Sequence, residues 1–193
     1  MNMKREMSEM LVGNNLTVNL GGITYHCKTA GPWVSTEIFF KGCARSCDGC
    51  FNSQLQDTSD MHVFKVNELV DLLLKNVPYK RVTISGGEPF LQTLALYDLV
   101  TKLKSHGFII ICYTGNELFD IQCDIEDPHI PTITQMCLDA ILHNIDILVD
   151  GEFMIDKKVE GVGFKPGLWI GSTNQRAINM PQTLKEGDIV LWR

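Results

Sequence analysis

The sequence predicts an α/β protein with a mostly parallel sheet and flanking helices. Short runs rich in apolar and β-branched residues alternate along the chain with segments of helical periodicity. The crossovers between the strand-like runs are about ten residues or longer, which is typical of parallel βα units. The least ordinary residues come directly after strands, at the edge where α/β sheets and βα barrels place their active sites. Four such strand ends are therefore expected to converge on one site.

The N-terminal part is predicted to be β-structure. Residues 16–28 form two β-rich runs joined by a glycine pair at 21–22, which indicates a small N-terminal β-hairpin. The Gly-Pro-Trp sequence at 31–33 interrupts this pattern before an apolar strand at 36–41. The polar stretch 54–61 is expected to be irregular.

The rest of the chain divides by the same two periodicities. Helical segments carry an apolar residue every three or four positions, whereas buried strands are short continuous apolar runs. In order, we expect a helix at 66–76, a strand at 81–85, a helix at 91–106 stopped by Gly107, a strand at 108–113, an acidic irregular stretch at 116–131, a helix at 132–142, a strand at 145–149, a loop marked by Gly161, Gly163 and Gly167, and a strand at 189–192.

Length and composition indicate one domain, residues 1–193, with an N-terminal β extension at 1–30 and the core at 31–193. The chain has 193 residues, 45% of them hydrophobic, which is enough to bury a substantial core. The net charge is −6 without a basic run, so no nucleic-acid partner is expected. Residues 1–10 do not resemble a signal peptide, and the longest strongly apolar run, 108–113, is too short to span a bilayer. We expect a soluble cytoplasmic protein without a membrane partner.

Cys43, Cys47 and Cys50 form a C-x3-C-x2-C pattern in a loop after the strand at 36–41. Four thiolates would close a cubane [4Fe-4S] cluster. Three leave one iron open, and an open metal position is typical of catalytic sites. The alternatives are a zinc knuckle or unrelated thiols, but the nearest Cys or His after Cys50 is His62. The pattern therefore favours a catalytic iron–sulfur centre held by these three metal ligands.

The other cysteines are expected to be structural. Cys27, Cys112, Cys123 and Cys137 are dispersed along the chain, and a cytoplasmic protein keeps its thiols reduced. Free cysteine commonly behaves as a small buried hydrophobe.

A second motif, Ser-Gly-Gly-Glu-Pro at 85–89, follows the strand at 81–85. Glycines at a strand end allow a ligand to approach the backbone closely. The glutamate adds an acceptor for a cationic amino group. Alone, the motif indicates a tight turn. Its position about 35 residues after the cysteine loop favours ligand binding.

Together these motifs resemble the radical S-adenosylmethionine (SAM) superfamily, in particular the activases of glycyl-radical proteins and above all that of anaerobic ribonucleoside-triphosphate reductase. The matching blocks, from about residue 36 onward, are Cys-Asp-Gly-Cys-Phe-Asn around Cys50, Tyr-Thr-Gly at 113–115, Leu-Val-Asp-Gly-Glu-Phe at 148–153 and Gly-Ser-Thr-Asn-Gln-Arg-Ala-Ile at 171–178. Two features depart from the pattern. Relatives usually carry Asp-Gly-x-Gly-x-Arg where this chain has Ala-Gly-Pro-Trp-Val-Ser at 30–35, and they often have His where it has Arg45.

The resemblance implies a partial (β/α) barrel of the radical SAM type. It implies that Cys43, Cys47 and Cys50 hold one [4Fe-4S] cluster whose open iron binds SAM. A one-electron reductant such as flavodoxin or ferredoxin would reduce the cluster. Cleavage of SAM would then yield a 5′-deoxyadenosyl radical, which takes hydrogen from a glycine of the reductase.

The resemblance and the strand-end positions also suggest cofactor-binding residues. These are Gly86, Gly87, Glu88, Pro89, Phe51, Thr114, Asp150, Asn174 and Arg176. The Gly-Gly-Glu-Pro motif is assigned to the SAM amino group. The guanidinium of Arg176 is suited to the SAM carboxylate. The alternatives are a turn for Asp150, an ion pair for Arg176 and core packing for Phe51.

Two other functions remain open. One is a small radical SAM enzyme that acts on a small molecule or peptide, for example of the deazaguanine-forming type. The other is a non-catalytic iron–sulfur protein of electron transfer. The intact Gly-Gly-Glu-Pro motif disfavours the second, because an electron carrier has no use for it.

Overall fold

The computed structural model describes residues 16–161 and 169–193. Residues 1–15 of the expected N-terminal extension lie outside this part, as do the loop residues Gly163 and Gly167. The elements are β1 (Thr17–Cys27), β2 (Ser35–Phe40), a 3-10 turn (Ser53–Leu55), β3 (His62–Lys65), α2 (Val66–Asn76), β4 (Arg81–Gly86), a 3-10 turn (Pro89–Gln92), α3 (Thr93–Ser105), β5 (Ile109–Tyr113), α4 (Leu118–Glu126), α5 (Thr132–Asn144), β6 (Ile147–Asp150), a 3-10 turn (Ile155–Lys157), β7 (Arg176–Asn179) and α6 (Met180–Glu186).

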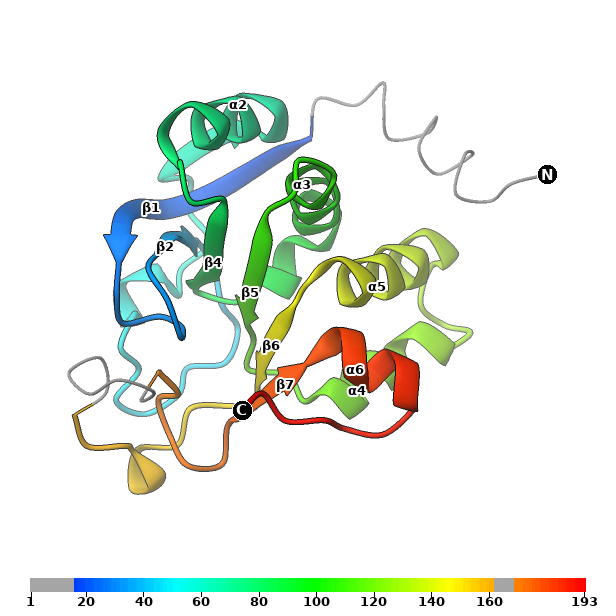
Figure 1. Cartoon of the computed structure of the whole chain (residues 1–193). Helices are drawn as coiled ribbons and strands as arrows, with labels where there is room; N and C mark the ends of the chain where they lie inside the picture. The colour runs from blue at the N-terminus through cyan, green and yellow to red at the C-terminus, as the bar shows by residue number, and fades with distance from the viewer. Residues whose placement is uncertain (1–15, 162–168) are drawn as a thin grey trace.

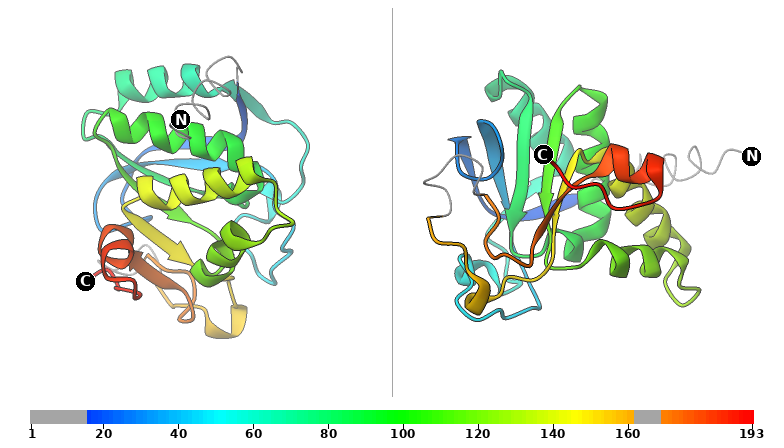
Figure 2. Two further views of the ribbon diagram at one scale, coloured as in Figure 1. Left: turned by 90° about the vertical axis from the view of Figure 1, so that its right-hand side faces the viewer. Right: turned by 60° about the horizontal axis from the view of Figure 1, so that its bottom comes forward.

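One seven-stranded sheet organises these elements, in the order β3-β1-β2-β4-β5-β6-β7. The four central strands β2, β4, β5 and β6 are parallel neighbours, and antiparallel strands flank them on both sides. Helices α2, α3 and α5 lie in a row across one face of the sheet (Figures 1 and 2). The opposite face is left open to loops, which is the arrangement of a partial (β/α) barrel. The predicted fold class is confirmed.

Strand residues alternate between the two faces of this sheet, as β geometry requires. The larger apolar cluster lies between the sheet and the helices. From β5 and β6 it includes Ile110, Cys112 and Leu148. The intervening residues Ile111 and Ile147 join a second cluster on the inner face. This inner cluster also contains Val149 and Trp169, with Trp33, Tyr113, Ile170, Ala177 and Trp192 packed against it.

The predicted hairpin is present, but its location within residues 16–28 is wrong. Thr17–Cys27 is one continuous strand, and the antiparallel hairpin partner of β1 is β2. The Gly21-Gly22 pair makes no turn. A β-carbon at Gly21 would lie 2.3 Å from a methyl carbon of Leu55, and the β1–β2 register shifts between Leu20 and Gly22. The glycines thus accommodate the packing of Leu55 and an irregularity in the strand pairing.

Three further segments differ from the prediction. The acidic stretch 116–131 contains helix α4, whose inward residues Leu118, Ile121 and Ile125 follow helical spacing. Strands β3 and β7 were not expected; each has only four residues and is defined by long-range pairing. The strand expected at 189–192 is a single bridge between Leu191 and Ile178. The expected helices at 66–76, 91–106 and 132–142 correspond to α2, α3 and α5.

The chemistry-bearing motifs follow the four parallel strands as predicted. The cysteine loop comes after β2, Gly87-Glu88 after β4, Thr114 after β5 and Gly151 after β6. Because the strands are parallel, these motifs meet at one edge of the sheet. Among the described helices, none has the length and apolar character needed to cross a membrane.

Candidate functional site

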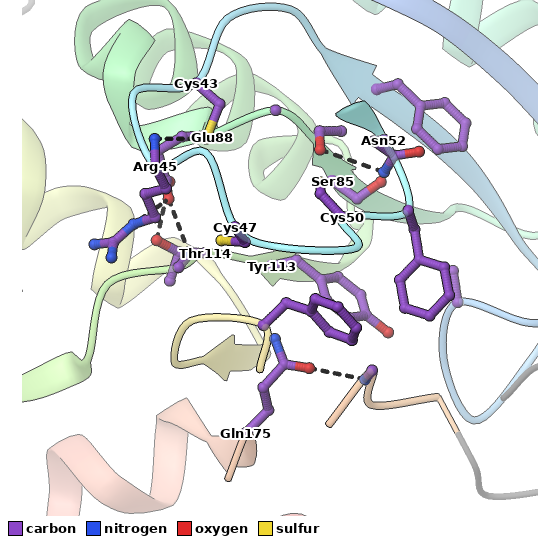
Figure 3. A pocket seen from close by; sticks show the side chains of 18 of the residues that line it. Cys43, Arg45, Cys47, Cys50, Asn52, Ser85, Glu88, Tyr113, Thr114 and Gln175 are labelled. Carbon is purple, nitrogen blue, oxygen red and sulfur yellow. Dashed lines mark hydrogen bonds and ion pairs between the residues drawn. The ribbon is translucent and has the colours of Figure 1, made fainter. Parts of the chain in front are cut away.

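A cavity of about 490 Å³ opens at this edge and extends over the inner face of the sheet. Eight predicted site residues line it, namely Cys43, Cys47, Cys50, Phe51, Gly86, Gly87, Glu88 and Thr114. Pro89, Asp150, Asn174 and Arg176 are not among the lining residues. Figure 3 shows the three cysteines projecting from one loop, with Tyr113 and Gln175 contributed by other segments.

The cysteine loop is held in place by backbone hydrogen bonds. The Gly42 and Cys43 amides donate to the carbonyls of Leu55 (2.7 Å) and Gln56 (2.8 Å), and the Cys50 amide donates to the Cys47 carbonyl (3.2 Å). The loop is therefore closed on itself and tied to the 3-10 turn that follows it. This restraint orders the backbone at two of the three thiols.

The thiols of Cys43 and Cys47 are weaker acids than ordinary cysteine thiols. Burial and the hydrogen-bonded carboxylate of Glu152 raise the pKa of Cys47 to about 11. Burial also raises the pKa of Cys43. A metal centre must displace these protons, since it binds the thiolate.

The donor set fits an iron–sulfur cluster. Cys43, Cys47 and Cys50 are the only Cys or His residues among the lining residues of the described part. In that part no group of three or more Cys, His, Asp or Glu is arranged around a single metal ion. A cubane cluster, by contrast, distributes its thiolates over different irons, so its cysteines need not converge on one point.

The glycines after β4 are required by close contact with the cysteine loop. The Gly87 amide donates to the Phe40 carbonyl and the Glu88 amide to the Gly42 carbonyl, each at 2.8 Å. A β-carbon at Gly87 would lie 2.2 Å from the Gly42 carbonyl oxygen. At Gly86 the φ angle is +106°, and a β-carbon would lie 2.5 Å from the backbone of Phe40. The motif therefore joins the two strand ends directly.

Gly87→Ala is expected to lower the free energy of unfolding by about 1–3 kcal/mol. The new methyl group would meet the Gly42 carbonyl oxygen, a backbone atom that cannot rotate away. Gly107→Ala is the control. Gly107, unlike Gly87, has a φ in the left-handed region (+78°), but nothing lies within 4 Å of the new methyl group, so only about 1 kcal/mol should be lost. Urea denaturation of the two variants measures the difference. Equal losses would show that Gly87 does not need the close approach.

Glu88 is buried, and its carboxylate accepts three hydrogen bonds from within the protein. One carboxylate oxygen accepts hydrogen bonds from the Phe90 amide (3.1 Å) and the Thr114 hydroxyl (2.9 Å). The other accepts from the Gly115 amide (2.9 Å) and lies 3.8 Å from the guanidinium of Arg45. Burial raises the pKa of Glu88, whereas these donors oppose the rise. A carboxylate has about four acceptor positions; three of them hold hydrogen bonds, and the Arg45 guanidinium lies beside the carboxylate.

Asp150 and Arg176 pair with each other, as the ion-pair alternative for Arg176 anticipated. Asp150 is fully buried, and the guanidinium meets both of its oxygens. Asp150 also accepts a hydrogen bond from the Leu118 amide at 2.9 Å. The hydrogen-bonded Asp150 raises the pKa of Arg176. The pair joins β6, β7 and the start of α4, and neither residue is among those that line the cavity.

The segment at 171–176 supports the loop after β6. The side-chain oxygen of Gln175 accepts from the amides of Gly171 and Ser172, and its nitrogen donates to the Gly151 carbonyl at 2.9 Å. Asn174 donates to the Glu152 carbonyl at 2.8 Å. The supported loop places Phe153 against Phe51, with ring centroids 5.0 Å apart. Phe51 is 54% exposed, so it covers the cavity from outside and is not a core residue.

The two departures from the family pattern have structural consequences. Arg45 reaches across from the cysteine loop to the Asn116 side chain at 2.5 Å. In the 30–35 segment, Trp33 packs edge-on against Trp192 (5.5 Å) and beneath the guanidinium of Arg81 (5.7 Å). This part of the segment therefore closes one end of the barrel interior with aromatic side chains.

The lining residues that sequence reasoning did not assign to the site include Glu37, Tyr113 and Gln175. For Glu37 a signal was present, because it is the one charged residue inside the apolar strand Ser35–Phe40. Tyr113 ends β5 directly before Thr114, the position that was singled out. For Gln175, only the long-range contact with Gly151 reveals its role.

Comparison with known proteins gives consistent results. The chain matches the family model of the 4Fe-4S single cluster domain over residues 29–178. The anaerobic ribonucleoside-triphosphate reductase-activating protein of Vibrio cholerae is 30% identical over 75% of this chain and 87% of its own length. The protein of that name from Escherichia coli K12 is 26% identical over 75% and 88%. The solved structure of E. coli QueE covers 60% of this chain and 57% of its own, with 14% identity and a TM-score of 0.47. By the family model and these relatives, the chain belongs to the 4Fe-4S single cluster domain family and, within it, to the radical SAM activating enzymes.

Proposed function

We propose that this chain is a radical SAM activase that cleaves SAM reductively and generates a glycyl radical on an anaerobic ribonucleoside-triphosphate reductase. One observation carries the proposal: the three cysteines and the Gly86-Gly87 turn line one cavity and are joined by backbone hydrogen bonds. The proposed ligands of the iron–sulfur cluster therefore lie next to the proposed SAM-binding turn. The names of the relatives support the reductase as target.

In this proposal Cys43, Cys47 and Cys50 hold one [4Fe-4S] cluster with an open iron, and the protein acts in the cytoplasm. When bound, the cluster and SAM supply one-electron cleavage of the sulfonium to methionine and a 5′-deoxyadenosyl radical. The electron comes from a reductant of the flavodoxin or ferredoxin class. The protein's own residues bind, orient and exclude water.

The Gly86–Glu88 backbone, rather than the Glu88 side chain, is assigned to the amino group of SAM. The backbone of this segment lies within reach of a ligand because Gly86, Gly87 and Glu88 all line the cavity. Glu88 is a positioning residue, since its carboxylate joins the end of β4 to the Thr114-Gly115 turn after β5. Thr114 acts through the same network. Phe51 and Phe153 shield one wall of the cavity from water.

The test combines reduced, anaerobically reconstituted protein with SAM and the anaerobic reductase from the same source. We expect an electron paramagnetic resonance doublet from a glycyl radical, with formation of 5′-deoxyadenosine in the same tube. SAM cleavage without the doublet would retain the radical chemistry and reject the reductase as target. Neither product, from protein with an intact cluster, would reject the proposed function.

A further inference from the structure

The inner faces of two strands give the cavity a polar wall. On β2 and β4, Glu37 and Ser85 line the cavity beside Phe39, and the Ser85 hydroxyl donates to Glu37 at 2.8 Å. On the same face Ser35 bonds Thr83 at 2.8 Å. The apolar cluster on the inner face of β5 and β6 reaches the cavity through Tyr113 and Trp169.

Glu37 is the charged group of the polar wall. It lies three residues before the end of β2, about 10 Å below the edge that carries the cysteines at the strand rise of about 3.3 Å per residue. Its two oxygens accept hydrogen bonds from the Ser85 hydroxyl (2.8 Å) and the Cys27 thiol (3.1 Å). Both donors are neutral groups, so neither brings a positive charge to the carboxylate.

The charge of Glu37 has no cationic partner within the described residues, where the ion pairs involve other carboxylates. The neighbouring Tyr113 does not compensate it, because its hydroxyl donates to the Trp169 carbonyl at 2.6 Å. Arg45, the one cationic residue among the described residues that line the cavity, is engaged with Glu88 and Asn116. Within the described part of the chain, about two of the four acceptor positions of Glu37 therefore have no donor.

This arrangement constrains what can fill the cavity. A substrate that covers Glu37 removes its water, and an ionised carboxylate without a counter-charge is costly in such a setting. Two neutral hydrogen bonds do not supply that charge. A substrate with a guanidinium or ammonium group would supply both the charge and the missing donors.

We propose that Glu37 is a specificity-determining residue that pairs with a cationic side chain, arginine or lysine, on the peptide segment that this cavity accepts. The inference rests on the proposed function, because it assumes that the substrate is a peptide loop of a protein. It adds the chemical class of the side chain that is recognised and the residue that recognises it.

The experiment compares two blocked peptides, acetyl-Ala-Arg-Gly-Ala-amide and the same peptide with citrulline, which keeps the shape of arginine without its charge. Binding to the reconstituted protein with SAM is measured by isothermal titration under anaerobic conditions. We expect the arginine peptide to bind at least about tenfold more tightly, a difference of about 1.4 kcal/mol. In Glu37→Gln this ratio should fall to near one.

Glu68→Gln is the matched control, because Glu68 is an exposed carboxylate on α2 outside the cavity; its ratio should equal that of the wild type. Thermal unfolding checks that Glu37→Gln is folded, since a glutamine oxygen can still accept from Ser85. Equal binding of the two peptides to the wild type, no binding of either, or an unchanged ratio in Glu37→Gln would each overturn the inference. Weaker SAM binding in Glu37→Gln with an unchanged ratio would overturn it too and assign Glu37 to the SAM hydroxyls.

These outcomes are separable from the proposed function, which the glycyl-radical doublet tests. A doublet without peptide discrimination removes only the role of Glu37. Discrimination without a doublet removes the reductase as target but leaves a cation-selective peptide site.

Discussion

Cys47→Ala protein is expected to lose the iron–sulfur centre and to cleave SAM at least about 100-fold more slowly than the wild type. Even residues that only orient metal ligands typically contribute 10- to 100-fold, so loss of a ligand should cost no less. Cys47 is half-exposed, and its only side-chain hydrogen bond among the described residues is to the exposed Glu152. The apoprotein should therefore keep its stability within about 0.5 kcal/mol, as surface substitutions usually do. Iron content, the visible absorption of the cluster, 5′-deoxyadenosine formation and urea denaturation measure these effects together.

Cys123→Ala is the matched control for this prediction. Cys123 is exposed on α4 and does not line the cavity. Its variant should bind iron and cleave SAM like the wild type. Wild-type iron content and SAM cleavage in Cys47→Ala would reject the assignment of the cluster to the Cys43–Cys50 loop.

Much of the fold could be predicted because local pattern and tertiary packing agree. The helix over Val66–Asn76 buries Val66, Leu69, Val70 and Leu73 at helical spacing, so periodicity alone locates it. Helix α4 was missed because its acidic composition was given more weight than the spacing of Leu118, Ile121 and Ile125. The hairpin was misplaced because a glycine pair serves equally for a turn and for a close approach.

The candidate site contains residues that local sequence identifies and residues that only the tertiary structure brings together. The cysteine loop and the Gly-Gly turn could be found because each is a continuous motif whose residue types are required by its chemistry. Glu37, Tyr113 and Gln175 are separated by long stretches of chain, and only the parallel sheet brings them to one cavity. Asp150 was expected near a ligand because of its strand-end position, and Arg176 because its guanidinium suits the SAM carboxylate. Pairing between β6 and β7 places the two side chains against each other. Their chemical types did not decide between these two roles.

Arg176→Met is expected to lower the free energy of unfolding by about 3–5 kcal/mol at neutral pH, because it leaves the carboxylate of Asp150 buried without its counter-charge. Only the Leu118 amide would still donate to Asp150. Urea denaturation of the variant and the wild type at neutral pH measures this loss.

Two comparisons make this result specific. Lys65→Met breaks the exposed Lys65–Glu68 pair and should cost no more than about 1 kcal/mol. Asp150→Asn combined with Arg176→Met removes the unpaired buried charge, so the double variant should be more stable than Arg176→Met alone. A double-mutant cycle of urea denaturation measures this difference.

If Arg176→Met instead keeps the stability of the wild type and binds SAM more weakly, the ion pair does not hold β7 and the start of α4 in place. The guanidinium would then belong to the ligand, as the sequence first suggested. Loss of stability with SAM affinity retained in the folded fraction would establish that Asp150 and Arg176 act on the cavity only through the strands they join.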